Sequence, residues 1–187
     1  MDRRDTLISE AIGIVRKAGY AGFSYADLSE AVGIRKASIH HYFPGKGDLG
    51  LAMVEAYRQA IARQLIEIEQ SASTCRERLR RYADLYRAAL DDSGCLCGVL
   101  AAEFAGLPLP VQAAIRDFFA DNISWLETVL LDGDTSNGAA GDSEQPVRQI
   151  AQMILATLQG ALLTARVQND VSIFDAAADT VLATIRG

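Results

Sequence analysis

Residues 11–49, AIGIVRKAGYAGFSYADLSEAVGIRKASIHHYFPGKGDL, predict two short helices joined by a tight turn. Ser24 is a typical helix N-cap, and Asp27 three residues later completes a capping box, so the first of these helices begins here. Gly33 favours the turn that ends it, and a second helix of about seven residues follows. Two short helices around a glycine turn are typical of a helix-turn-helix.

The second helix is expected to place its apolar residues inward and its polar residues outward. Ile39 and Phe43 are four residues apart, so both side chains would face the core. Basic, hydroxyl and aromatic side chains contact phosphates and base edges in DNA. The outward side chains of this kind are Arg35, Lys36, Ser38, His40, His41 and Tyr42. The alternative is an ordinary three-helix packing unit in which these residues are solvated or belong to the core.

The charge distribution agrees with a DNA-binding front part. The chain of 187 residues has a net charge of −6. Residues 1–63 hold nine Lys or Arg against seven Asp or Glu, whereas residues 64–187 hold nine Arg against seventeen acids. Because phosphate binding depends on local positive potential, an acidic total does not exclude DNA as a partner.

Residues 5–55 resemble the DNA-binding region of the TetR family of bacterial transcriptional regulators. The matching positions are Gly19, Tyr20, Ser24, Gly33, Ile39, Tyr42, Phe43, Lys46 and Leu49. The resemblance implies a ligand-responsive repressor that binds a double-stranded, pseudo-palindromic DNA operator as a homodimer and is released by a small-molecule effector. With the outward residues above, it predicts a DNA-contacting set of Ser24, Arg35, Lys36, Ala37, Ser38, His40, His41, Tyr42 and Lys46. Arg35 stands where the family commonly has a capping serine, and His40 where tyrosine is usual.

Helical periodicity continues along the whole chain, and there is almost no strand signal. We therefore expect an all-α protein of about nine helices. Residues 1–46 would form the helix-turn-helix domain, and residues 47–187 a larger effector-binding and dimerisation domain. The helices expected after the helix-turn-helix span residues 46–70, 74–92, 97–106, 109–131, 146–168 and 172–186, with a loop at 132–144.

Other general properties point to a cytoplasmic protein. No run approaches about 18 uninterrupted apolar residues, so no membrane span is expected. The first twenty residues mix acids with bases and do not have the pattern of a signal peptide. Three cysteines are too few, and odd in number, for a disulfide framework, which favours a reducing compartment.

The helix at 146–168 predicts a second copy of the chain. From Met153 to Val167 it is apolar nearly all round, and such a helix must be covered on more than one side. Its string LQGALL also resembles the dimerisation helix of many TetR-like regulators. The alternative is an internal helix of a monomer. The predicted dimer interface is Ile154, Leu158, Ala161, Leu162, Ala165, Phe174, Ala178, Val181 and Leu182.

Aromatic residues gather in the middle of the chain, where apolar walls with a few polar groups describe either a small-molecule pocket or a plain core. The predicted pocket set is Tyr82, Tyr86, Cys97, Phe104, Phe118, Trp125, Met153 and Gln159. Arginines nearby could attract an anionic effector. Their spacing instead favours salt bridges along one helix: Glu77–Arg81, Arg80–Asp84 and Arg87–Asp91.

Cys95 and Cys97 form the only motif with potential reactivity. A thiolate near a helix N-terminus is favoured by the backbone dipole, so a redox or electrophile sensor is an alternative function. A small thiol peroxidase using the same pair is a weaker alternative, since no partner base is evident. The plain interpretation is two small side chains packed at a helix start. We expect no metal, no cofactor, no catalytic residues and no enzyme activity.

Overall fold

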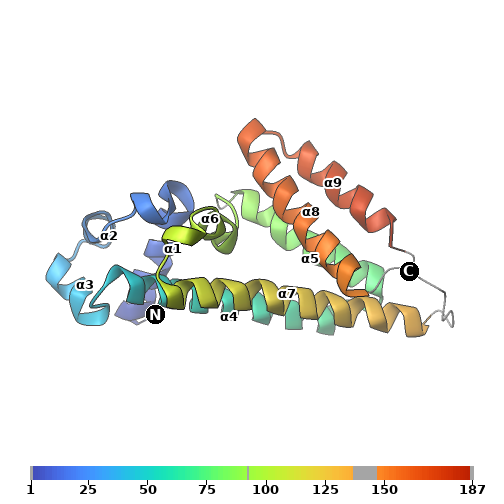
Figure 1. Cartoon of the computed structure of the whole chain (residues 1–187), viewed down its shortest axis with the longest axis horizontal. Helices are drawn as coiled ribbons and strands as arrows, with labels where there is room; N and C mark the ends of the chain where they lie inside the picture. Colours follow the sequence, from blue (N-terminus) through green and yellow to red (C-terminus); the bar gives the residue numbers. More distant parts are fainter. Residues whose placement is uncertain (1, 92, 137–146, 186–187) are drawn as a thin grey trace. The chain divides into compact units, whose positions relative to one another are not determined.

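The structure is a computed structural model that describes residues 2–91, 93–136 and 147–185. Over these residues it consists of nine α-helices and one 3₁₀ helix, with no strand (Figure 1). The prediction of an all-α fold is confirmed.

The helices pack into two compact units. The first unit contains residues 1–61 and 95–118, and the second contains residues 62–94 and 119–187. Because each spans a unit boundary, α4 (Lys46–Ser71) and α7 (Leu109–Ser136) contribute to both. The predicted boundary after residue 46, between a DNA-binding domain and an effector-binding and dimerisation domain, differs from the boundaries of these packing units. It stays a prediction.

The first unit holds the helix-turn-helix. α1 (Arg3–Gly22) packs on α2 (Tyr25–Val32) and on α6 (Leu96–Ala102), while α2 packs on α3 (Lys36–Tyr42). A 3₁₀ turn, η1 (Phe104–Gly106), follows α6. Each apolar side chain buried here stabilises the unit by roughly 1.5–3 kcal/mol. The core includes Leu7, Val15, Phe23, Leu28, Ile39, Phe43, Leu49 and Met53.

Local capping fixes α2 as predicted. The Ser24 hydroxyl accepts a hydrogen bond from the N–H of Ala26 (3.2 Å), and the Asp27 carboxylate accepts from the Ser24 N–H (2.8 Å) and hydroxyl (2.6 Å). Gly33 ends α2 in the left-handed region with φ +69°, which favours glycine. Both the capping box and the glycine stop are confirmed.

The second unit is built on α5 (Cys75–Asp91), α8 (Val147–Gln168) and α9 (Ser172–Ala183). α8 and α9 run side by side (Figure 1), and both pack on α5. Among the described residues, α8 alone has the length and apolar composition of a membrane span, a property that core helices of soluble proteins share. Its buried face packs against α5 and α9.

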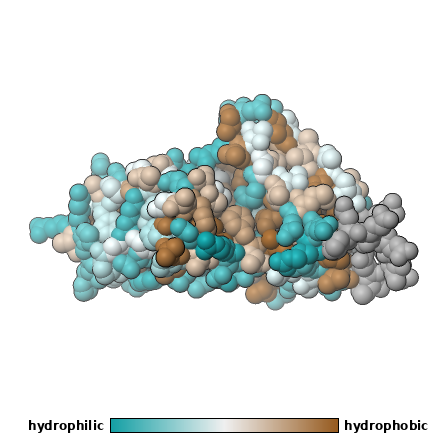
Figure 2. All heavy atoms as spheres, viewed as in Figure 1, coloured by the Kyte–Doolittle hydropathy of each residue, from teal (hydrophilic) through white to brown (hydrophobic). Residues whose placement is uncertain are grey.

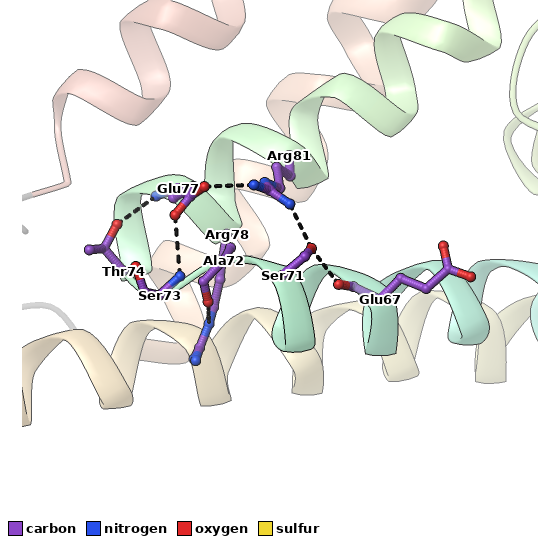
Figure 3. A network of polar contacts seen from close by, with 8 residues as sticks. All are labelled: Glu67, Ser71, Ala72, Ser73, Thr74, Glu77, Arg78 and Arg81. Atoms are coloured by element: carbon purple, nitrogen blue, oxygen red, sulfur yellow. Dashed lines mark hydrogen bonds and ion pairs between the residues drawn. The ribbon is translucent and has the colours of Figure 1, made fainter.

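A polar network closes the turn between α4 and α5 (Figure 3). Arg81 donates hydrogen bonds to the Glu77 carboxylate (2.7 Å) and to the Ser71 hydroxyl (2.6 Å), and Glu77 also accepts from the Ser73 N–H (3.2 Å). These bonds, the one from Ser73 first, lower the pKa of Glu77. The predicted pair Glu77–Arg81 is confirmed.

The other two salt bridges predicted within α5 are wrong. Arg80 pairs with Asp179 (2.5 Å) and Arg87 pairs with Asp175 (2.8 Å), both on α9, and not with the acids four residues further along α5. The reason is tertiary, since α9 packs on α5 and offers carboxylates to the same arginines. All four side chains are largely exposed, so each pair contributes at most about 1 kcal/mol.

The helix predicted at 97–106 is divided at Glu103. α6 ends one residue earlier, and η1 begins one residue later. The Glu103 carboxylate accepts hydrogen bonds from the backbone of α1, so a contact distant in sequence accompanies the break.

The helix predicted at 109–131 continues to Ser136. Gly133 sits directly against α5, because a Cβ there would lie 2.8 Å from the Cβ of Cys75. A glycine therefore lets α7 continue past α5 where the sequence pattern predicted a loop. Residues 137–144 of the predicted loop lie outside the described residues.

Candidate functional site

α3 places its polar side chains on the surface of the first unit. Ile39 and Phe43 are at most 2% exposed, which confirms that they face the core. All seven predicted contact residues in or beside α3 are exposed: Arg35, Lys36, Ala37, Ser38, His40, His41 and Tyr42. The helix and its N-cap residue thus offer two basic groups, two hydroxyls and three rings to a partner.

Arg35 precedes α3 and makes no side-chain cap, as its replacement of a capping serine predicts. Its guanidinium is exposed. His40 is more constrained, because its Nδ1 lies 3.2 Å from the carbonyl oxygen of Pro44 and its ring packs edge-on against Tyr25 at 4.8 Å. Of these two departures from the family pattern, Arg35 therefore has more freedom to move toward DNA.

Tyr25 fixes the orientation of α3 and was not identified from the sequence. Its hydroxyl lies 2.9 Å from the carbonyl oxygen of Phe43 and 2.8 Å from that of Gly45, so α2 is tied to the turn that follows α3. Burial first, and then the charge of Asp48, raise the pKa of Tyr25 to about 12. The hydroxyl remains a neutral donor at any physiological pH.

Lys46, a member of the predicted DNA-contacting set, packs against two aromatic rings. Its ammonium lies 4.6 Å from the centre of the Tyr20 ring and 5.5 Å from that of Phe23. Partial burial lowers the pKa of Lys46, while the charges of Glu103 and Asp27 raise it. Cation–π contacts of this kind contribute about 0.5–1 kcal/mol at exposed sites.

Ser24, the other predicted contact outside α3, is exposed, but its hydroxyl is engaged in the capping box. It could meet a phosphate only by sharing that hydroxyl with the cap.

Four of the eight predicted pocket residues meet in the second unit. The Tyr82 hydroxyl donates to Asn122 Oδ1 (2.9 Å) and lies 3.3 Å from the Tyr86 hydroxyl, to which Gln159 Nε2 donates at 3.5 Å. The Trp125 ring stacks on Tyr82 at 5.3 Å. We call these five residues the tyrosine–amide cluster. The sequence analysis missed Asn122, which is 2% exposed, because α7 carries several other polar residues and nothing local marks this one as buried.

The remaining predicted pocket residues lie elsewhere. Cys97, Phe104 and Phe118 belong to the first unit, and Met153 is 40% exposed on α8. The prediction grouped residues by aromatic character along the sequence, which does not distinguish the two units.

The nine predicted interface residues of α8 and α9 are all buried within a single chain. Their burial therefore needs no second copy, because α8, α9 and α5 cover one another. The large apolar side chains that stay exposed around the same two helices are Met153, Leu163, Val167 and Val171. Figure 2 shows apolar (brown) atoms near the turn that joins α8 to α9.

Cys95 and Cys97 are both buried at the start of α6. Burial first, and then the neighbouring Cys95, raise the pKa of Cys97, and the positive charge of Arg16 only partly opposes this. The pKa of Tyr57 is also raised, mainly by burial and then by Cys95, to which it is hydrogen-bonded. The surroundings therefore disfavour a thiolate at Cys97.

A short, exposed, basic helix held behind a glycine turn defines the first unit as a helix-turn-helix DNA-binding unit. The family model described as "Bacterial regulatory proteins, tetR family" matches residues 7–53. The model described as "Transcriptional regulator LmrA/YxaF-like, C-terminal domain" matches residues 71–180. The chain belongs to the TetR family of bacterial regulatory proteins, and it is a DNA-binding transcriptional regulator.

Individual relatives match most of the chain. The chain is 28% identical over 174 residues to the HTH-type transcriptional repressor NemR of Escherichia coli (strain K12), covering 89% of this chain and 85% of NemR. A TetR family regulator from Agrobacterium tumefaciens is 35% identical with a TM-score of 0.90, covering 98% of this chain and 97% of that one. The reduced form of E. coli NemR gives 26% identity and a TM-score of 0.82, covering 97% and 95%.

Proposed function

We propose that the protein is a homodimeric, cytoplasmic repressor that binds a pseudo-palindromic operator through α3 and is released by a small-molecule effector. The relatives are transcriptional regulators, one of them a repressor, and the proposal includes no catalytic step. The observation that carries it is the surface at and beside α3, where Arg35, Lys36 and His41 are exposed while Ile39 and Phe43 are buried.

In this proposal each subunit inserts α3 into a major groove. Two copies related by a two-fold axis bind half-sites about 34–36 Å apart, or a multiple of that distance. Arg35 is the best candidate for reading a guanine, because a guanidinium can bond both acceptors on its major-groove edge. Lys36 supplies a phosphate contact, which adds affinity without sequence preference.

Selection from a random DNA pool tests this proposal. The purified protein is expected to enrich sequences with inverted half-sites, centred one or two helical turns apart. Enrichment of sequences without dyad symmetry would contradict the dimeric operator. Enrichment of nothing would contradict sequence-specific binding altogether.

The second copy is proposed to cover the exposed apolar side chains of α8 and its turn to α9. Leu163 is 64% exposed and Val167 is 77% exposed, and they lie four residues apart on one helix face. Scattered exposed leucines are ordinary, but adjacent ones on a helix mark a contact surface. This placement replaces the buried set predicted on α8 and α9 with exposed residues of α8 and of the turn that follows it.

The effector is proposed to bind at the tyrosine–amide cluster. Hydroxyl and amide groups inside an apolar unit can orient a ligand and select among ligands. The Trp125 indole N–H is buried and has no hydrogen-bond partner within the described residues, so it is a donor available to an acceptor on the ligand. An effector that bound DNA-incompetent dimers more tightly would shift the population away from the operator.

Trp125 is the single tryptophan of the chain, so its fluorescence reports directly on this cluster. Titration with candidate effectors is expected to shift or quench the emission at the concentrations that release DNA. The control is Tyr86→Phe, which removes one hydroxyl. It should lower the affinity for the effector and leave the affinity for the operator unchanged. Effector-driven release with unchanged emission would place the effector elsewhere.

A second candidate function is thiol-based sensing by Cys95 and Cys97. The observation that favours it is that Cys95 is hydrogen-bonded to Tyr57, whose ring packs against the cationic Arg16 (5.3 Å) as well as against Phe118. Operator binding with and without reductant tests it. Loss of binding on oxidation that disappears in Cys95→Ser would support sensing, and equal binding in both conditions would reject it.

A further inference from the structure

The Glu103 side chain contacts α1 at the point where that helix is interrupted. Its Oε1 accepts a hydrogen bond from the Tyr20 N–H and its Oε2 accepts one from the Ala21 N–H, both at 2.7 Å. Gly19 has φ +77° and ψ 169°, far from helical values, so the N–H groups that follow it lose their partners within the helix. The carboxylate of Glu103, the residue between α6 and η1, replaces those bonds with two charge-assisted ones.

The residue at the break, Gly19, leaves space for the Glu103 carboxylate. A Cβ at position 19 would overlap Glu103 Oε1, so this position needs glycine for space as well as for its positive φ. Gly33 provides a useful comparison, since its φ is similar (+69°) but no atom lies within 4 Å of where its Cβ would be. The absence of a side chain at Gly19 thus makes room for the Glu103 carboxylate, whereas at Gly33 glycine is needed only for the positive φ of the turn.

The segment after the break is held from the other side by α4. The Tyr20 hydroxyl donates to the Lys46 carbonyl oxygen (3.1 Å), and the Lys46 ammonium covers the rings of Tyr20 and Phe23. Ser24, the first residue of the capping box, follows at once. The direction in which α2 and α3 leave α1 is therefore set between Glu103 and the start of α4, all within the first unit.

We propose that Glu103 is a positioning residue for operator binding: its carboxylate holds the Gly19 break closed and thereby places α2 and α3 where the operator requires them. The inference rests on the proposed function and adds to it one side chain, at the C-terminal end of α6, that controls DNA affinity. Binding to an arbitrary sequence needs only positive charge near phosphates, so it does not depend on this placement.

The first test is Glu103→Gln, which keeps the size of the side chain but turns its NH₂ toward one of the two backbone donors. Affinity for the sequence enriched from the random pool is expected to fall about tenfold, equivalent to ~1.4 kcal/mol. Affinity for a mixed-sequence duplex should stay within about twofold. The matched control is Glu55→Gln, which removes an exposed carboxylate on α4. This substitution should change the affinity neither for the selected sequence nor for the mixed-sequence duplex.

A double-mutant cycle tests the pair directly. Gly19→Ala displaces the carboxylate, so adding Glu103→Gln to it should weaken operator binding by less than twofold further. Adding Glu103→Gln to Gly33→Ala should still lower the affinity for the operator by a factor of about ten. Additive effects in both cycles, or operator affinity unchanged in folded Glu103→Gln, would overturn the proposal.

If Glu103→Gln does not fold, amide hydrogen exchange of the unmodified protein decides the matter. Operator DNA is expected to slow exchange at Tyr20 and Ala21 at least tenfold more than in α8. Equal slowing would overturn the proposal. Failure of the proposed function would look different, since the unmodified protein would then bind no selected sequence.

Discussion

The Lys46 ammonium lies 4.6 Å from the centre of the Tyr20 ring, and the Tyr20 hydroxyl donates a hydrogen bond back to the Lys46 carbonyl oxygen. One residue at the start of α4 is thus bound to the end of α1 by its side chain and by its backbone. Lys46 has a structural role whether or not its charge also acts on a phosphate. Two substitutions separate these roles.

Lys46→Met keeps most of the aliphatic stem and removes the charge. It is expected to weaken binding to all DNA sequences alike and to reduce the slope of log affinity against log salt by about one. Lys46→Ala also loses the packing on the rings, so its unfolding free energy should fall by about 1 kcal/mol more. Anisotropy titrations at several salt concentrations and urea unfolding measure the two effects. An altered sequence preference with an unchanged salt slope would argue against a phosphate contact.

Arg35 and Lys36 are adjacent but should behave differently. Arg35→Ala is expected to cost about 1–3 kcal/mol on the operator and to relax specificity at one base pair, because it removes a contact to a base edge. Lys36→Ala should lower the affinity for all DNA sequences by about the same factor. Selection from random DNA with each variant distinguishes these outcomes, with Lys17→Ala, an exposed lysine on α1, as the charge-matched control. If the Arg35 variant enriches the same consensus as the unmodified protein, Arg35 does not read a base.

The capping box gives the helix-turn-helix a defined response to acid. The hydrogen bonds from the Ser24 hydroxyl and N–H lower the pKa of Asp27, so the folded state favours its ionised form. This contribution to stability is complete above the unfolded pKa, near 3.9, and is lost as the pH falls through the lower folded value. Thermal unfolding between pH 2 and 6 should therefore show a smaller acid loss for Asp27→Asn than for the unmodified protein.

Glu30→Gln provides the control for that measurement. Glu30 is an exposed carboxylate on the same helix, so replacing it removes a negative charge from α2 and leaves the capping box in place. An identical acid loss in Asp27→Asn and the unmodified protein would mean that the capping carboxylate does not stabilise the fold.

Charge on the exposed face of α8 should separate the proposed dimer. Leu163→Glu places a carboxylate where an apolar contact is expected, and burying an unpaired charge is costly. Light scattering should then give the 20.1 kDa mass of one chain instead of twice that mass. Ile66→Glu on α4 is the control, since Ile66 is similarly exposed but lies outside α8 and α9. A dimer that survives Leu163→Glu and Val167→Glu together would require another interface.

Local rules account for what the sequence predicted well. The cap at Ser24, the stop at Gly33 and the inward direction of Ile39 each depend on residues within a few positions along the chain. These rules place the helix-turn-helix and its exposed side chains without knowledge of the rest of the fold.

Tertiary choices account for what the sequence did not predict. Arg80 and Arg87 each had an acid four residues along, yet they pair with acids on α9 that lie nearly a hundred positions later. Glu103 lies where a helix was expected to continue, and its carboxylate bonds to α1. Asn122 is a buried amide whose partner, Tyr82, lies forty positions earlier. No local pattern distinguishes these partners from the alternatives.

The most direct test of the central claim is fluorescence anisotropy of the purified protein with a labelled duplex from its own upstream region. The account predicts saturable binding of two chains per duplex, weakened steeply by salt and competed by unlabelled operator far better than by random DNA. Absence of binding at low salt, both to that duplex and to a random-site pool, would contradict the assignment of α3 as a DNA-binding helix.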